Sequence, residues 1–133
     1  MFETGFRLNI AGIPLIGKID RMDRKESGHE IIDYKTGEAK DQKAVDKDRQ
    51  LIIYALGARE ALGLEIEITS LYIIEENRKV ESKRTQKDLE KELEFVKEMI
   101  EKINTFDFPT KPGYPFPCKF CEYNHICPFA INQ

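Results

Sequence analysis

The sequence predicts a mixed α/β (α+β) domain in which helices flank a central β-sheet, and three observations support this class. Short segments with alternating or β-branched apolar residues are separated by turns, as is typical of strands. Two longer segments carry apolar residues at helical spacing. The chain has 133 residues, 41% hydrophobic and 34% charged, which fits one ordinary soluble domain.

Three short strands are expected first, at residues 5–11, 15–23 and 29–36. In the first of them, apolar and polar side chains alternate, which is a strand pattern. Gly12 and Pro14 mark a turn after it, and a polar loop separates the second strand from the third. Because the connections are short, we expect an antiparallel meander.

A helix, a strand and a second helix follow. Apolar residues at helical spacing predict a helix over 46–62, which Gly63 would cap. Residues 66–76 are rich in β-branched side chains and predict a strand. Residues 85–104 carry a single apolar stripe, which favours packing against the core over a partner surface.

The end of the chain differs in composition from the rest. Residues 106–117 hold four prolines and are not expected to form regular structure. We therefore assign residues 1–108 to a folded core and residues 109–133 to a proline-rich strap followed by a cysteine segment.

Composition excludes several functional classes. The net charge of −3 gives no global electrostatic case for nucleic-acid binding, so such a function must depend on a local site. No apolar run is long enough to cross a bilayer, no secretory signal is visible, and no P-loop motif is present. A cytoplasmic location without ATP hydrolysis is the resulting expectation.

The residues with the clearest chemical potential are two carboxylates and a lysine. Asp33 and Lys35 are two apart on the third strand and so share a face of the sheet, and hairpin pairing would bring Asp20 beside Asp33. Two carboxylates, with the carbonyl of Tyr34 as a further ligand, would hold Mg²⁺ or Mn²⁺. A nearby lysine would assist a water nucleophile or stabilise charge on an attacked phosphate.

An exposed Asp–Lys ion pair on the outer face of the sheet is the alternative that spacing alone allows. The bulky residues Ile31, Ile32 and Tyr34 around Asp33 favour a site in which the charges are paired or bind metal. On the next helix, Gln50 and Tyr54 are four residues apart and share one face, although each alone fits a surface or core residue equally well.

These motifs together resemble those of RecB-like nucleases of the PD-(D/E)XK superfamily. The segments GKIDRMD, IIDYKTG and QLIIY are similar to the family pattern G-x-x-D-R, D-x-K-T-G and Q-x-x-x-Y, in the same order. The resemblance covers about residues 3–60, and the cysteine segment extends it to 127. It implies a restriction-endonuclease-like core.

The resemblance also implies a role for each matching residue. Asp20 and Asp33 would be metal-binding carboxylates, Lys35 the active-site lysine, and Gln50 with Tyr54 an accessory helix motif that positions the lysine or the substrate. The family usually has a helix before the first strand that contributes a His or Glu to the metal. We expect that helix to be missing here, because neither Glu3 nor His29 occupies the corresponding place.

The three cysteines lie together near the end of the chain. Cys118, Cys121 and Cys127 form C-x2-C-x5-C, a spacing typical of zinc or iron–sulfur ligands, and His125 would complete a zinc site. Unconnected buried cysteines are the plainer alternative. The spacing is similar to the C-terminal triad of iron–sulfur nucleases related to AddB and to CRISPR-associated RecB-like nucleases. That resemblance implies a [4Fe–4S] cluster whose fourth cysteine lies upstream, and therefore an incomplete ligand set in this chain.

The sequence thus predicts a metal-dependent DNA nuclease acting on single-stranded or resected DNA, in repair and recombination or in CRISPR-type processing, with a helicase or CRISPR-type subunit as a further partner. A catalytically inactive module that binds DNA or acts as a scaffold in a helicase–nuclease complex is the alternative. A small zinc-bearing interaction domain explains the cysteines but not the ordered Asp, Asp-x-Lys and Gln-x-x-x-Tyr series.

Overall fold

The computed structural model describes residues 1–37, 40–106 and 118–130, without the side chain of Lys119. The chain divides into two compact units, Met1–Ile100 and Glu101–Gln133, which are described separately. The boundary expected between residues 108 and 109 lies outside the described residues. In the part of the chain described, no helix is both long and apolar enough to cross a membrane.

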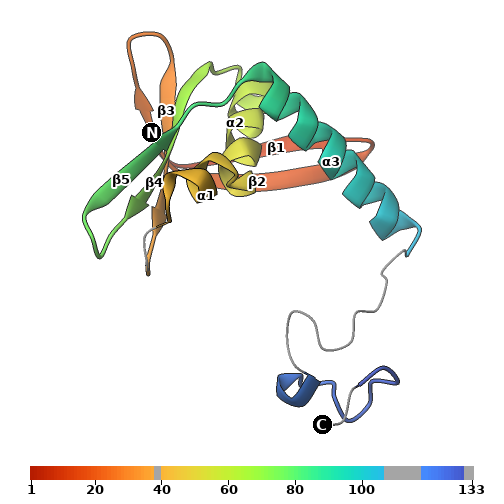
Figure 1. Ribbon diagram of the computed structural model, residues 1–133. Coiled ribbons are helices and arrows are strands. Elements are labelled where there is room, and N and C mark those ends of the chain that lie inside the picture. The colour runs from red at the N-terminus through yellow and green to blue at the C-terminus, as the bar shows by residue number, and fades with distance from the viewer. Residues whose placement is uncertain (38–39, 107–117, 131–133) are drawn as a thin grey trace. The chain divides into compact units, whose positions relative to one another are not determined.

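The first unit is built on a five-stranded sheet with the order β1-β2-β3-β4-β5. Strand β3 pairs parallel with β4, and the other neighbours pair antiparallel. The predicted mixed sheet is therefore confirmed, and its first three strands form the expected antiparallel meander (Figure 1). The strands are β1 (Phe2–Ile10), β2 (Ile13–Arg24), β3 (His29–Lys35), β4 (Ile66–Ile73) and β5 (Arg78–Ser82).

The crossover between β3 and β4 contains two helices, α1 (Gln42–Asp46) and α2 (Arg49–Leu62). The sequence predicted one continuous helix from Asp46, and this start was wrong. Asp48 has an extended backbone, and its side chain caps α2 by accepting the Leu51 N–H at 3.3 Å. The helix ends at Gly63, whose φ of 66° lies in the left-handed region that favours glycine.

The segment predicted as a single strand over 66–76 is in fact two strands. Strand β4 ends at Ile73, and β5, Arg78–Ser82, turns back to pair with it. No apolar pattern predicts β5, because Val80 is its only apolar residue and the alternation that marks a strand is absent.

The core lies on one face of the sheet, between the strands and the helices α2 and α3 (Gln86–Asn104) (Figure 1). Leu89 of α3 is buried there, and the apolar stripe of α3 continues along the same core, so this helix packs as predicted. Strands β1 to β3 and helix α2 contribute the other buried residues of this cluster, which are Phe6, Leu8, Ile10, Ile19, Met22, Ile31, Ile52, Ala55, Leu56 and Ala58. A second, smaller cluster contains Val45, Leu51, Leu71 and Ile73.

The ring of Phe6 fills a space that two glycines leave open. A Cβ atom at Gly17 of β2 or at Gly57 of α2 would overlap this ring. The helix therefore approaches the sheet closely at Gly57, and the same contact fixes the position of α2 and of the residues at its start.

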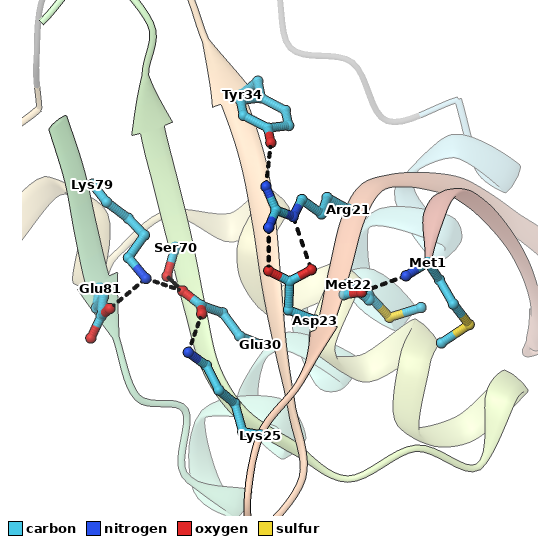
Figure 2. Close-up of polar contacts among 10 residues, drawn as sticks. All are labelled: Met1, Arg21, Met22, Asp23, Lys25, Glu30, Tyr34, Ser70, Lys79 and Glu81. Carbon is cyan, nitrogen blue, oxygen red and sulfur yellow. Dashed lines mark hydrogen bonds and ion pairs between the residues drawn. The ribbon is translucent and has the colours of Figure 1, made fainter. Parts of the chain in front are cut away.

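The opposite face of the sheet carries a polar network centred on Glu30, which is 1% exposed. Its carboxylate forms ion pairs with Lys25 and Lys79, each at 2.8 Å, and accepts a hydrogen bond from Ser70 at 2.6 Å (Figure 2). Burial acts to raise the pKa of Glu30, but these three partners outweigh it and lower the pKa to about 2.

This network predicts a specific loss of stability in acid. Because the folded pKa of Glu30 lies below the unfolded value, its contribution is present above about pH 4.5 and is lost as the pH falls towards about 2. We expect Glu30→Gln to lower the free energy of unfolding by roughly 1–3 kcal/mol at pH 7 and to flatten the decline in that window. Urea unfolding at several pH values measures both effects, and an unchanged acid profile in the variant would contradict the assignment.

The described part of the second unit contains the short 3₁₀ helix η1 (Cys118–Phe120) and a series of turns. Backbone hydrogen bonds from Cys121 N to Cys118 O at 3.0 Å and from Cys127 N to Tyr123 O at 2.9 Å hold these turns. All three cysteines are free thiols.

Candidate active site

The site begins where β2 and β3 separate. Their backbone pairing reaches Arg21 and Ile32, and one residue further along lie Asp20 and Asp33. There the Asp20 side chain replaces the backbone pairing between the two strands: its Oδ2 accepts a hydrogen bond from the Tyr34 N–H at 3.0 Å. This bond holds the Asp20 carboxylate against β3, directly beside the residue that follows Asp33.

An irregularity in β2 accompanies this change. Ile19 and Met22 both belong to the core although they are three residues apart, so the alternation of faces is interrupted between them. The facing residue of β1, Glu3, has a φ of 48°, and the pairing passes from Phe2–Arg21 to Thr4–Ile19. Distortions of this kind redirect side chains next to active sites, and here the residue concerned is Asp20.

Asp33 is buried, with 2% of its surface exposed. Its Oδ2 lies 2.8 Å from Lys35 Nζ in an ion pair. The angles at this contact fall outside those of a hydrogen bond, but the ammonium group is a close ionic partner of this oxygen. A carboxylate has about four lone-pair sites, so Asp33 keeps some that could bind a metal ion.

The pKa values of Asp33 and Lys35 are both raised above their ordinary values. Burial raises the pKa of Asp33 most; the nearby Lys35 opposes this, and the charges of Asp20 and Asp48 add to it. Burial acts to lower the pKa of Lys35, but Asp33 and neighbouring charges outweigh it and raise the pKa. Lys35 is therefore a cation at neutral pH, which suits it to stabilise negative charge better than to remove a proton.

A chain of hydrogen bonds connects the lysine to helix α2. Lys35 Nζ donates to Gln50 Oε1 at 2.6 Å, and Gln50 Nε2 donates to the Tyr54 hydroxyl at 2.7 Å. Tyr54 in turn packs edge-on against Phe6, with 6.1 Å between the ring centroids. The first turns of α2 thus hold the ammonium group in place.

Two residues near the site were missed by sequence reasoning. Asp48, the cap of α2, pairs with Lys40 at 2.7 Å, and its charge contributes to the raised pKa values of Asp33 and Lys35. An Asp three residues before Leu51 is a recognisable helix-cap signal, and it could have placed Asp48 at the start of the helix and hence near Gln50.

The side chain of Tyr34 lies away from this group. Its hydroxyl accepts a hydrogen bond from Arg21 at 3.1 Å on the opposite face of the sheet (Figure 2). Only the backbone of Tyr34 is next to the carboxylates, through its bond to Asp20. His29 is also remote from them, with Nδ1 3.3 Å from the carbonyl of Glu65.

Within residues 1–37, 40–106 and 118–130, no three His, Cys, Asp or Glu side chains are grouped as metal ligands. The carboxylates of the candidate site are a pair, Asp20 and Asp33. The cysteine segment does not bring Cys118, Cys121 and Cys127 together either.

The arrangement of two acidic residues and a lysine on adjacent strands has a counterpart among known proteins. A sequence profile of the PD-(D/E)XK nuclease superfamily matches residues 1–128. The chain belongs to this superfamily. Its mixed sheet with flanking helices accordingly has the restriction-endonuclease-like fold that the motifs implied.

One solved structure supports the fold independently. This chain resembles the protein in the "Crystal structure of SSO0001", with a TM-score of 0.57 and 17% sequence identity. The match covers 99% of this chain and 61% of that one, so the chain spans about three fifths of the other protein's length. At this identity the likeness concerns the fold alone. A comparison with curated proteins found no match.

Proposed function

We propose that this PD-(D/E)XK domain is a Mg²⁺- or Mn²⁺-dependent deoxyribonuclease whose active site contains Asp20, Asp33 and Lys35. The observation that carries the proposal is the buried Asp33 carboxylate, which has Lys35 Nζ at 2.8 Å and Asp20 near enough for its charge to raise the pKa of Asp33. Two carboxylates beside a lysine suit a divalent cation, and the superfamily consists of nucleases.

The donor set fits a hard divalent ion. Asp20 and Asp33 would hold it through carboxylate oxygens, and the carbonyl of Tyr34 would be a further ligand. When bound, such an ion neutralises charge on the scissile phosphate and lowers the pKa of a coordinated water. The hydrogen bond from Tyr34 N orients the Asp20 carboxylate.

Lys35 would act on the phosphate. Its ammonium, held by Asp33 and Gln50, would stabilise the negative charge that develops on the phosphate oxygens during in-line attack by water. Gln50 and Tyr54 would position this lysine and, through the exposed amide of Gln50, contact the substrate backbone.

The order of the three motifs supports a RecB-like subtype. We infer an exonuclease that acts on single-stranded or resected DNA in repair, recombination or CRISPR-type processing, alongside a helicase or CRISPR-type subunit. The superfamily membership and the G-x-x-D-R, D-x-K-T-G and Q-x-x-x-Y series support this narrower assignment.

For the cysteine segment we infer a [4Fe–4S] cluster that requires a fourth ligand from outside this chain, with Cys118, Cys121 and Cys127 as the other three. Zinc completed by His125 is the alternative. The three thiols are free and at least partly accessible, but the described residues do not group them, so metal binding would have to draw them together. Iron and zinc analysis of anaerobically purified protein distinguishes the two, and one zinc per chain without iron would defeat the cluster.

A catalytically inactive module that binds or guides DNA is the second candidate function. The observation that favours it is the pair of carboxylates without a third acidic or histidine ligand in the described part of the chain. Metal-dependent DNA binding without cleavage would support it.

Cleavage of labelled single-stranded DNA with Mn²⁺ tests the enzyme. We expect Lys35→Met to reduce the rate by about 10²–10³-fold, because it removes the cation near the phosphate and keeps the aliphatic stem. Lys18→Met is the matched control: Lys18 also forms an ion pair, with Glu3 at 2.9 Å, but is largely exposed. Equal activity in the two variants would remove Lys35 from the site.

A further inference from the structure

A polar cavity lies between the start of α2 and the helix α3, within the first unit. It has a volume of about 360 Å³, near the lower end of the usual range for small-molecule sites, about 300–1,000 Å³. Three acidic and three basic residues line it together with Ile52; they are Asp46, Lys47, Arg49, Asp88, Lys91 and Glu92.

Glu92 is the residue that marks this cavity as a candidate site. It is 6% exposed, and its Oε1 has no hydrogen-bond partner among the described residues. Arg49 is its nearest cation, but the distance from Nε to Oε2 is 3.9 Å, too long for a hydrogen bond. The Arg49 guanidinium is instead stacked on Phe95, 3.4 Å from the ring centroid.

The other two acids are already engaged. Asp46 accepts hydrogen bonds from Ser82 and Gln42, and Asp88 accepts from Thr85 at the start of α3. The lysines at the rim, Lys47 and Lys91, are exposed. The cavity therefore offers one carboxylate oxygen, Glu92 Oε1, without a hydrogen-bond donor among the described residues, and two exposed lysines among its lining residues.

A ligand for such a cavity must carry an N–H donor for the carboxylate and an anion for the lysines. A nucleotide combines both, with an exocyclic amino group on the base and a phosphate behind it. A carboxylate accepts well from the N4 amino group of cytosine and is repelled by the O4 carbonyl that thymine has at the same place.

The cavity is also close to the active site along the chain. Arg49 and Gln50 are consecutive residues in the first turn of α2, with Cα atoms about 3.8 Å apart. One residue lines the cavity and the other binds Lys35. The first turn of α2 therefore supplies residues both to the cavity and to the candidate active site.

We propose that this cavity is a subsite for one nucleotide of a single-stranded DNA substrate, in which Glu92 selects a base that bears an amino group and Lys47 and Lys91 bind phosphate. The proposal deepens the proposed function, on which it rests only for the choice of DNA as ligand. It makes the protein prefer cytosine over thymine at one position.

Fluorescence anisotropy in EDTA at fixed salt tests this without cleavage. The probes are oligo-dC and oligo-dT of about 12 nucleotides, within the usual site size for single strands. We expect wild-type protein to bind oligo-dC about fivefold or more tightly than oligo-dT. Glu92→Gln should reduce this ratio and Glu92→Leu should abolish it, whereas Glu98→Gln, at an exposed position of the same helix, should preserve it.

The proposed binding of phosphate by Lys47 and Lys91 is tested separately. Replacing Lys47 and Lys91 together by Ala should weaken binding of both oligonucleotides alike and flatten the salt dependence. Lys97→Ala should change neither the binding nor its salt dependence, because Lys97 forms an exposed ion pair with Glu94 of the same helix. Equal binding of the two probes by wild-type protein, or an unchanged ratio in both Glu92 variants, would overturn the proposal.

These results separate the subsite from the nuclease. A dC preference that depends on Glu92 in a protein that never cleaves DNA would retain the subsite and defeat the enzyme. Cleavage that depends on Lys35 without any such preference would do the reverse.

Discussion

Asp33→Asn is expected to slow cleavage by about 10²-fold or more while leaving the protein as stable as the wild type, or more stable, at pH 7. The carboxylate is buried and forms an ion pair with Lys35 at 2.8 Å. Its loss would remove one of the two proposed metal ligands, which is worth several kcal/mol in the transition state. The amide is neutral, so the cost of burying a charge disappears with it.

The pH dependence of unfolding gives the sign of the effect of Asp33 on stability. Burial, with the charges of Asp20 and Asp48, raises the folded pKa of Asp33 above the unfolded value. Its contribution to stability is therefore greatest in acid and declines as the pH rises from the ordinary carboxyl range to the raised pKa. Asp33→Asn should remove that decline, as urea unfolding in EDTA measures.

Asp23→Asn is the matched control with the opposite signs. Asp23 lies on β2 and forms two hydrogen bonds with Arg21, at 2.6 and 2.9 Å, which lower its pKa (Figure 2). Replacing it should lower stability modestly and leave cleavage unchanged. If Asp33→Asn were the destabilising variant and remained active, the carboxylate would be structural.

Gly57→Ala should destabilise the protein by about 1–3 kcal/mol, although alanine is the better helix former by about 1 kcal/mol. The added methyl group would overlap the Phe6 ring, which already fills the space between α2 and β2. Because α2 carries Gln50, the displaced helix should also weaken the contact with Lys35 and slow cleavage.

Two further variants test whether overlap with the Phe6 ring causes the loss of stability in Gly57→Ala. Gly5→Ala lies on the neighbouring strand, where a Cβ would meet only Gly17 O at 3.9 Å, and it should be close to neutral. Phe6→Leu combined with Gly57→Ala should cost less than the sum of the single changes, because the smaller side chain vacates the space. Strict additivity in thermal or urea unfolding would contradict the overlap.

The local parts of this account could be predicted from sequence. A period of two places Asp33 and Lys35 on one face of β3, and a period near four places Gln50 and Tyr54 on one face of α2; these pairs contact each other at 2.8 and 2.7 Å. The antiparallel meander followed from apolar alternation and short turns.

Features that depend on tertiary contacts could not be predicted. The bond from Lys35 to Gln50 joins a strand to a helix across the crossover, and no periodicity encodes it. Strand β5 is held by pairing with β4 and not by its own apolar pattern. The burial of Glu30 depends on Lys25 and Lys79, which lie in separate parts of the sequence.

We propose that Asp20 and Asp33 together bind a divalent cation next to Lys35. The most direct measurement is anomalous X-ray scattering from crystals of this chain soaked in Mn²⁺. We predict one strong peak within about 2.0–2.6 Å of oxygens from both carboxylates, absent in crystals of Asp33→Asn. A crystal that binds Mn²⁺ elsewhere, or at Asp20 without Asp33, would contradict the account.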